Sequence, residues 1–231
     1  MPGGSLSIVI PVLDEARGIA LALSALAPLR AEGAQIVVVD GGSADATREL
    51  AGPLCDRLVE APRGRGAQMN AGARVASGEL LVFLHADTRL PVDAGRAIRD
   101  ALARGEWGRF DVTIDGADRL LALVAAMMNA RSRLTGIATG DQAIFVRRTA
   151  FDVAGGFPEI ALMEDVELCK RLRRLSRPVC LRERVTTSAR RWRRHGTLRT
   201  IFLMWRLRLA YALGADPRRL ARRYDVERTS S

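Results

Sequence analysis

The chain has 231 residues, of which 48% are hydrophobic and 27% are charged, a composition typical of one large globular domain. Its net charge of +10 is uneven: residues 170–231 carry 19 Lys and Arg against 4 Asp and Glu, whereas residues 1–169 carry 17 against 22. Three scattered cysteines without metal-ligand spacing exclude a disulfide scaffold, and the longest apolar run, residues 120–128, is too short to span a bilayer. Because MPGGSLSIVIPV lacks a charged n-region and a cleavage site, we expect no signal peptide and a cytoplasmic location.

Strand-like and helical runs alternate through the first hundred residues. The strand-like runs are 6–12, 36–40, 57–61 and 80–84. The helical runs are 15–29, 44–54 (with Ser43 or Asp45 as N-cap), 66–76, and a helix after Pro91 that ends near residue 103. This alternation predicts a parallel sheet with right-handed crossovers and helices on both faces.

The order changes after Gly105. We expect strands at 107–114, 143–147 and 179–187, the first of which could be antiparallel. We expect helices at 118–133, 166–175, 198–213 and 217–224. The predicted fold class is therefore α/β: one domain with a mostly parallel mixed sheet flanked by helices, followed by a basic helical C-terminal appendage. We place this α/β domain at residues 1–190 and the extension packed on it at residues 191–231.

Acidic residues follow two of the predicted parallel strands, at the edge where open α/β sheets bind ligands. Asp40 precedes Gly41, whose lack of a side chain lets a ligand approach, although a tight turn explains this pair equally well. Asp87 follows the most buried strand. One carboxylate, two phosphates and waters suffice to hold Mg²⁺ or Mn²⁺, and a cation there would neutralise a departing diphosphate. The alternative is that Asp87 or Thr88 caps the helix after Pro91, but this leaves a carboxylate at the end of that strand unexplained.

Other polar clusters have two interpretations each. Arg65, in RGRG before a helix, fits phosphate neutralisation or a solvated loop. Asp165, with Glu164 beside it, fits removal of a proton from a sugar hydroxyl, or complements a helix macrodipole. The segment Gly140-Asp141-Gln142 fits a polar acceptor pocket or a turn. His195, in a basic stretch, has no specific role in the simplest interpretation, but as a nitrogen ligand beside Asp87 it would favour Mn²⁺.

Taken in order, the segments IVIPVLDEA, VVVDGGSADAT, GAQMNAGARVASGELLVFLHADT, GGF and EDVELCKRL resemble family 2 glycosyltransferases, inverting enzymes with the GT-A fold. The resemblance covers about residues 5–177. The strings HADTRLP, AQMNAGA and GDQAIFVRR further resemble a bacterial subgroup of arsenosugar-biosynthesis glycosyltransferases.

The resemblance implies a role for each matching residue. The residues that would line the nucleotide are Pro11, Leu13, Glu15, Asp40, Gly41, Arg65 and Ala86. Asp87 matches the last acid of the family's DxD motif, the metal ligand, and a late histidine in some members makes His195 the second candidate. Asp165 matches the general base, and the acceptor would meet Gly140, Asp141, Gln142 and Glu164. The chain departs from the family where His85 replaces the first Asp of DxD and where Leu13 replaces an aromatic ring.

The implied reaction moves a sugar from a nucleoside-diphosphate sugar to an acceptor hydroxyl with inversion, using Mn²⁺ or Mg²⁺. A nucleotidyltransferase on a related sheet would instead release pyrophosphate. A nucleic-acid-binding protein would use the basic C-terminal quarter, but no nucleic-acid motif or row of stacking aromatics supports it, and we expect no nucleic-acid partner. The segment IFLMWRLRLAYALG, residues 201–214, fits a helix packed on the domain or peripheral contact with the inner face of the membrane.

Overall fold

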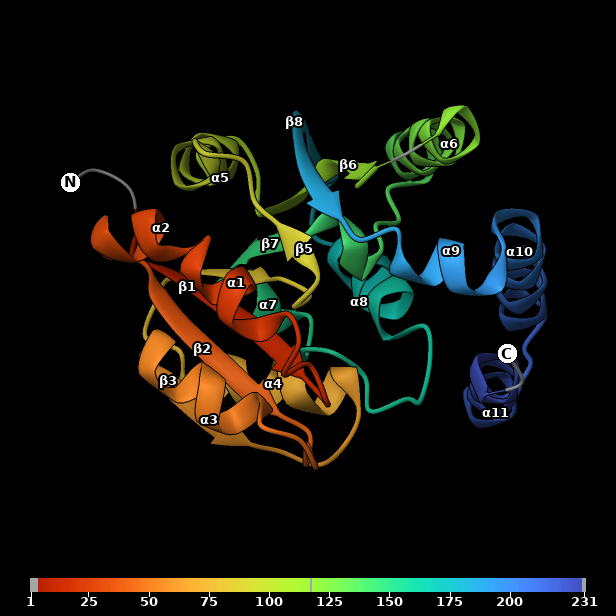
Figure 1. Ribbon diagram of the computed structural model, residues 1–231. Coiled ribbons are helices and arrows are strands. Elements are labelled where there is room, and N and C mark those ends of the chain that lie inside the picture. Colours follow the sequence, from red (N-terminus) through yellow and green to blue (C-terminus); the bar gives the residue numbers. More distant parts are fainter. Residues whose placement is uncertain (1–3, 117, 230–231) are drawn as a thin grey trace.

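One mixed sheet organises the computed structural model, which describes residues 4–116 and 118–229 (Figure 1). Its eight strands follow the order β3-β2-β1-β4-β7-β6-β8-β5. The strands are β1 (Leu6–Val12), β2 (Gln35–Asp40), β3 (Arg57–Glu60), β4 (Leu80–Phe83), β5 (Thr88–Arg89), β6 (Trp107–Ile114), β7 (Ile144–Arg147) and β8 (Val179–Thr187).

Helices flank this sheet, and the last three lie together on one side of the molecule (Figure 1). In the first half they are α1 (Ile19–Ser24), α2 (Ala27–Ala31), α3 (Thr47–Ala51), η1 (Gly52–Leu54), α4 (Arg65–Val75) and α5 (Ala94–Leu102). In the second half they are α6 (Arg119–Thr135), η2 (Gly140–Gln142), α7 (Arg148–Val153), α8 (Glu164–Leu172), α9 (Arg190–His195), α10 (Thr197–Ala212) and α11 (Pro217–Thr229).

Strands β1, β2 and β4 are buried on both faces of the sheet because they are almost continuously apolar. Strand β1 pairs in parallel with β2 and β4, and β2 pairs in parallel with β3. Successive side chains of a strand point to opposite faces. Ile8 and Ile10 accordingly join one core cluster, whereas Val9 joins the other with Val37 and Val39. Packing on both faces fixes the register of the strands, and with it the edge at which their carboxyl ends meet.

The second half of the sheet is mixed, as the change of pattern after residue 105 indicated. Strand β7 is antiparallel to both β4 and β6, β6 is parallel to β8, and β5 is antiparallel to β8. The predicted strands all form. The sequence patterns missed β5, α7 and α9, because elements of two to six residues are too short to show a period.

The helix predicted over residues 15–29 is wrong as one element, since the structure has the two short helices α1 and α2. Pro28 lies in the first turn of α2. A proline at that point has no N–H for the preceding turn and clashes with it, so a single helix cannot run through it.

The basic C-terminal helices pack on the start of α8 through an apolar cluster. Its buried members are Leu162, Met163, Leu207, Leu220 and Tyr224. Helix α9 spans Arg190–His195, so the domain boundary predicted after residue 190 falls within a helix. Among the described residues, no helix combines the length and apolarity needed to traverse a bilayer.

Candidate functional site

The loops after β1 and β2 are fastened to each other at the carboxyl edge of the sheet. The backbone N–H of Asp14 donates to Ser43 Oγ (3.0 Å), and the N–H of Ala44 returns a bond to Asp14 Oδ1 (2.8 Å). The N–H of Glu15 donates to Thr47 Oγ1 at 2.8 Å. Two loops from neighbouring strands thus form one rigid rim.

Asp40 holds its own loop in place. The N–H groups of Gly42 and Ser43 each donate to its carboxylate at 3.0 Å, and the Ser43 hydroxyl donates to it as well. The residue is fully buried. Contact with a ribose would therefore have to share these oxygens with the turn, so the turn interpretation explains the observed bonds, and the nucleotide contact stays a prediction.

The buried side-chain amide of Gln68 holds the ends of β1 and β2 together beneath this rim. Gln68, in α4, donates from Nε2 to the backbone carbonyls of Val12 and Val39, both at 2.8 Å. A Cβ on Gly41 would lie 3.0 Å from the same Nε2, so glycine permits the loop to rest on the amide. Pro11 and Leu13 are half-buried in the same rim, and their contact with a nucleotide stays a prediction.

Arg190, which the sequence patterns did not single out, connects the C-terminal part of the chain to this rim. Its Nη2 donates to both carboxylate oxygens of Glu15, at 3.0 and 3.2 Å. This hydrogen bond, opposed by partial burial and assisted by the charges of Glu15 and Asp87, raises the pKa of Arg190. Arg190 is therefore a fixed cation between two of the predicted donor-site carboxylates.

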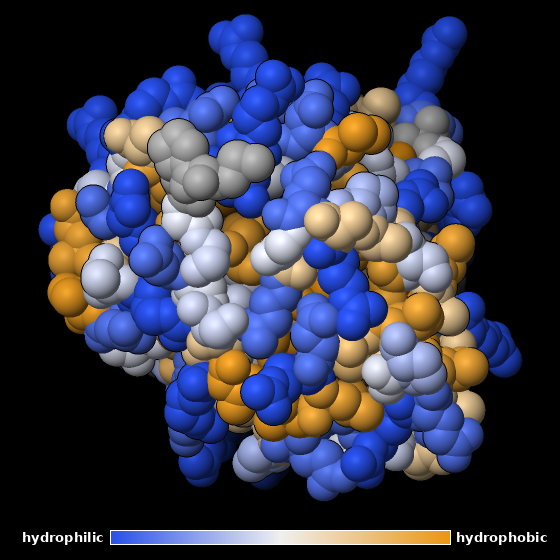
Figure 2. Space-filling model, turned by 90° about the vertical axis from the view of Figure 1, so that its left-hand side faces the viewer, coloured by the Kyte–Doolittle hydropathy of each residue, from blue (hydrophilic) through white to orange (hydrophobic). Residues whose placement is uncertain are grey.

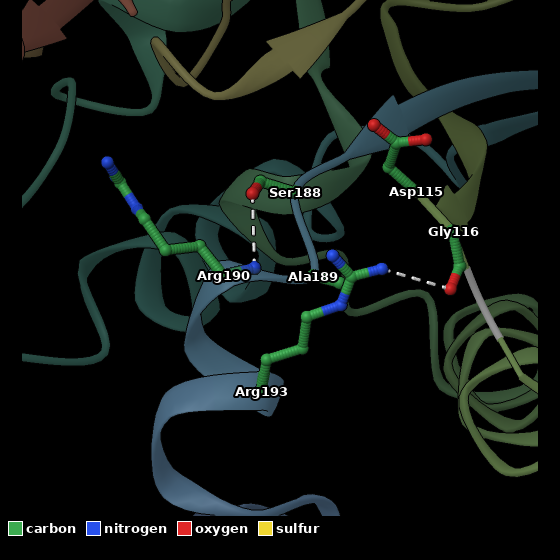
Figure 3. A pocket seen from close by; sticks show the side chains of 6 residues that line it. All are labelled: Asp115, Gly116, Ser188, Ala189, Arg190 and Arg193. Atoms are coloured by element: carbon green, nitrogen blue, oxygen red, sulfur yellow. Dashed lines mark hydrogen bonds between the residues drawn. The ribbon is translucent and has the colours of Figure 1, made fainter. Parts of the chain in front are cut away.

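An open pocket of about 570 Å³ lies beside Arg190 (Figure 3). In Figure 3 the Arg190 side chain extends away from Arg193, which donates to the carbonyl of Gly116 (3.3 Å). The pocket is lined by Asp115, Gly116, Ser188, Ala189, Arg190 and Arg193. It thus joins the ends of β6 and β8 to the start of α9.

Asp87 lies in the exposed turn between β4 and β5, after the half-buried Ala86. Its backbone carbonyl accepts from the N–H of Ser188 at 3.1 Å, which ties the turn to β8. Helix α5 begins only at Ala94, with Asp93 before it, and Thr88 belongs to β5. Neither Asp87 nor Thr88 caps that helix, so the capping alternative is wrong.

Two residues before Asp87, His85 links this turn to a second acidic group. Its Nδ1 lies 3.5 Å from Asp141 Oδ1, and its ring covers Gly140, where a Cβ would come within 2.2 Å of Nε2. The N–H of Gly140 donates to Asp165 Oδ2 at 3.0 Å, and the N–H of Val166 donates to Oδ1 at 2.7 Å. Three segments that are distant in sequence, around His85, Gly140 and Asp165, therefore meet at the Asp165 carboxylate.

Glu164 and Arg65 form an ion pair next to Asp165. Arg65 Nε lies 2.8 Å from Glu164 Oε1, where the Glu164 side chain is 4% exposed and that of Arg65 36%. Burial raises the pKa of Glu164, and the Arg65 charge opposes that rise without cancelling it. Desolvation lowers the pKa of Arg65, but the charges of Glu164 and Asp165 outweigh it and keep this guanidinium protonated. Arg65 is thus paired with Glu164, the acid predicted to meet the acceptor, and its predicted contact with the base or diphosphate stays a prediction.

Three non-glycine residues of the described chain have positive φ, and all flank this site. They are Asp14 (52°), Ala143 (46°) and Met163 (72°), at the ends of the β1 loop, η2 and the loop before α8. Residues in this region cost free energy and persist where the surrounding structure holds them. The loops that carry the acids are therefore held in specific, strained conformations.

Two further predicted site residues are Gln142, which is buried, and His195, which ends a helix. Gln142 is fully buried, and its Nε2 donates to Ser132 Oγ of α6 at 3.0 Å while its Oε1 accepts from the Thr139 N–H at 3.3 Å. An acceptor contact from Gln142 would require this network to open. His195 ends α9, and its side chain lies outside the described residues.

The Asp87 carboxylate could hold a metal ion only if the phosphates of a substrate supplied further ligands. Within the described residues, no group of three or more His, Cys, Asp or Glu side chains is arranged to hold a metal ion. Mg²⁺ and related ions are commonly held by one or two carboxylates together with substrate phosphates and water. An exposed carboxylate at the sheet edge meets that requirement, so the residues present fit a cation that arrives with a diphosphate.

Proteins of known structure share this fold. A mannosyltransferase from Pyrobaculum calidifontis, solved with GDP-Man and Mn²⁺, is 20% identical with a TM-score of 0.63, covering 99% of this chain and 71% of its own. S. aureus TarS 1-349, solved with UDP-GlcNAc, is 16% identical with a TM-score of 0.63, covering 80% of this chain and 58% of its own. The predicted α/β fold of the GT-A type is confirmed.

Sequence comparisons find similarity to one family in the first half of the chain. Residues 7–119 match the model of glycosyl transferase family 2. A PGL/p-HBAD biosynthesis glycosyltransferase of Mycobacterium bovis is 35% identical over 91 residues, 36% of this chain and 36% of the relative. An uncharacterized glycosyltransferase of Nostoc sp. is 30% identical over 89 residues, 36% of this chain and 28% of the relative. The matched segment spans about a third of these curated relatives. Residues 7–119 are thus similar to family 2 glycosyltransferases, and the activity of the whole chain is a matter for proposal.

Proposed function

We propose that this chain transfers a sugar from a nucleoside-diphosphate sugar to an acceptor hydroxyl with inversion, with Mn²⁺ or Mg²⁺ as cofactor. One observation carries the proposal: the chain of contacts that leads from the Asp87 turn through His85 and Gly140 to Asp165. It couples a carboxylate suited to a phosphate-bound cation to a carboxylate suited to a hydroxyl. A transferase needs both, on opposite sides of the bond that breaks.

Asp165 is the proposed general base. A sugar hydroxyl becomes a good nucleophile only as its proton is removed in the transition state. Each Asp165 oxygen accepts one backbone N–H. A carboxylate oxygen has two lone pairs, so each retains one for the hydroxyl. Its two backbone bonds hold the carboxylate in one orientation, and in-line attack then inverts the anomeric carbon.

The nucleotide would occupy the rim made by the β1 and β2 loops, with Asp87 holding the cation and the diphosphate beside it. A divalent cation there supplies positive charge to the phosphate oxygens as the nucleoside diphosphate leaves. Arg190 adds a second positive charge close to Asp87 and Glu15. The structural relatives solved with GDP-Man and UDP-GlcNAc suggest these as the first donors to assay.

The acceptor would approach over Gly140, Asp141 and Glu164, with the protein in the cytoplasm. Its identity, including the narrower resemblance to arsenosugar biosynthesis, stays a prediction. The proposal is tested by incubating the chain and Mn²⁺ with a nucleoside-diphosphate sugar and candidate hydroxyl acceptors, and in a second reaction with a nucleoside triphosphate and a sugar phosphate. Release of a nucleoside diphosphate in the first reaction supports the proposal, whereas release of pyrophosphate in the second reaction alone assigns the chain to the nucleotidyltransferases.

Two variants test the assigned roles separately. We expect Asp165→Asn to lower turnover by about 100-fold or more while donor affinity changes little, because general-base catalysis contributes on this scale. We expect Asp87→Asn to abolish the effect of Mn²⁺ on donor binding, measured by calorimetry. The exposed carboxylate of Asp152, on α7, gives the control variant Asp152→Asn. Near-normal turnover in Asp165→Asn with intact donor binding contradicts the base assignment.

A further inference from the structure

Helix α10 exposes a continuous apolar stripe that no other described part of the chain covers. Five large side chains along it are between 63% and 79% exposed: Leu198, Phe202, Trp205, Leu209 and Leu213, the last at the C-cap. Their spacings of four, three, four and four residues place them on one face of a helix. Isolated exposed apolar residues are ordinary, but a contiguous row marks an interaction surface.

The opposite face of α10 already has a partner. Leu207 is buried with the start of α8 and with α11, and Leu203, Met204 and Tyr211 pack around it. Tyr211 also donates to Glu167 of α8 at 3.2 Å. The helix is thus anchored by one face, so the stripe is a permanent feature of the surface.

Arginines border the stripe on both sides. With about 100° per residue, Arg199 and Arg206 lie about 60–80° from its centre on one side, and Arg208 lies about 100° away on the other. The guanidinium of Arg206 lies over the Phe202 ring, 5.7 Å from its centre. Arginine can cover apolar surface with its stem while its head reaches toward anionic groups. No acidic residue occurs between Thr197 and Ala212.

Exposed apolar side chains and exposed arginines also occur on the helices next to α10. Helix α6 shares an apolar cluster with Trp192 of α9 and Ile201 of α10, and it exposes Leu123, Met127 and Leu134. For comparison, the face that carries α2 and β3 lies on the opposite side of the molecule from α10 (Figure 1). On that face, apolar residues are interspersed with hydrophilic ones (Figure 2). The exposed arginines of α11 add to the positive charge near α10.

We propose that the apolar stripe of α10 docks on an anionic lipid bilayer, with α10 lying in the plane of the headgroups. A helix of 16 residues is about 24 Å long, shorter than the hydrocarbon core of about 30 Å, so it lies on the bilayer and does not cross it. Apolar side chains flanked by arginine are the composition of interfacial helices. A second copy fits this face poorly, because a two-fold contact would bring the arginines of both copies together.

Vesicle sedimentation of the full chain, without donor or acceptor, tests the proposal independently of glycosyl transfer. We expect binding to vesicles of equal parts phosphatidylglycerol and phosphatidylcholine, at least about tenfold weaker binding to pure phosphatidylcholine, and weakening at high salt. Phe202→Glu/Trp205→Glu should lower affinity by about tenfold or more, since both side chains would leave the bilayer. The matched control is Leu21→Glu/Val153→Glu, which changes two side chains of similar exposure (71% and 72%) on α1 and α7 and should bind like the wild type.

Fluorescence locates the contact. Trp107 is fully buried, whereas Trp205 is 63% exposed. A blue shift on adding anionic vesicles, lost in Trp205→Phe while sedimentation persists, places Trp205 in the bilayer. Three results would overturn the proposal: no sedimentation at low salt, equal loss in the control variant, or a dimer in solution that dissociates in Phe202→Glu/Trp205→Glu while vesicles do not bind. Circular dichroism establishes that each variant is folded.

Discussion

Replacing Arg65 by methionine tests the electrostatics of the candidate site through stability alone. The substitution leaves Glu164 buried beside Asp165 without the cation that Arg65 supplies at 2.8 Å. Breaking a fully buried ion pair costs about 3–5 kcal/mol. Because the Arg65 side chain is 36% exposed, water screens part of the interaction, and we expect a loss of about 2 kcal/mol. For a chain of this size this lowers Tm by about 4–8 °C.

The pH dependence separates this explanation from a loss of packing. Burial raises the pKa of Glu164 in the folded state, and Arg65 opposes the rise. In Arg65→Met the folded pKa therefore rises further above the unfolded value. An acid of this kind stabilises the fold below its unfolded pKa and loses that contribution as pH rises through the folded pKa. The variant should consequently be most destabilised at high pH and recover as Glu164 takes up a proton.

Urea unfolding of the wild type and variants, followed by circular dichroism at about pH 8 and pH 5, measures this difference. Arg65→Met/Glu164→Gln should regain most of the lost free energy, because a neutral amide needs no counter-charge. The exposed pair of Arg48 and Glu60 supplies a control, and Arg48→Met should cost less than about 1 kcal/mol. Equal destabilisation of Arg65→Met at both pH values, together with no recovery in the double variant, would refute the reasoning.

Other predictions concern the scaffold of the site. Gln68→Leu should lower the free energy of unfolding by about 2–4 kcal/mol in urea titrations, because two buried backbone carbonyls lose their donor; a change below about 1 kcal/mol would contradict it. Gly140→Ala should reduce transfer strongly by displacing His85, whereas Gly18→Ala, where a Cβ meets nothing within 4 Å, should leave it unchanged. The thiol of Cys169, whose pKa burial raises, should react with a disulfide reagent only on unfolding; fast reaction in the folded protein would show that it is accessible.

Strands β1, β2 and β4 could be predicted from the sequence because each is a nearly continuous apolar run that stops at polar residues. Strand β1 has the predicted bounds, and β2 and β4 end within a residue of them. The carboxyl ends of parallel strands must share one edge, so the acids that follow β2 and β4 could be assigned to one region. Burial on both faces leaves little freedom in such strands, and this explains why the prediction is accurate there.

The contacts that assemble the site could not be predicted in the same way. The pairing of Arg190 with Glu15 joins residues 175 positions apart, and a single basic residue in an arginine-rich segment gives no local signal. The stacking of His85 on Gly140 depends on how η2 meets β4. Gln142 was predicted from its loop to meet the acceptor, and only the structure shows that its Nε2 donates to Ser132 Oγ of α6. The positions of these side chains depend on tertiary contacts, which the periodicity of a sequence does not indicate.

The link between Arg190 and Glu15 has a consequence for the order in which the protein becomes complete during synthesis. The parallel strands leave the ribosome first, together with Glu15 in the loop after β1 and Asp87 in the turn after β4. Their shared cation is supplied only when the chain has been extended through β8 to α9. A nascent chain released before residue 190 would therefore present two uncompensated acids at its rim, so the charge pattern distinguishes finished molecules from truncated ones.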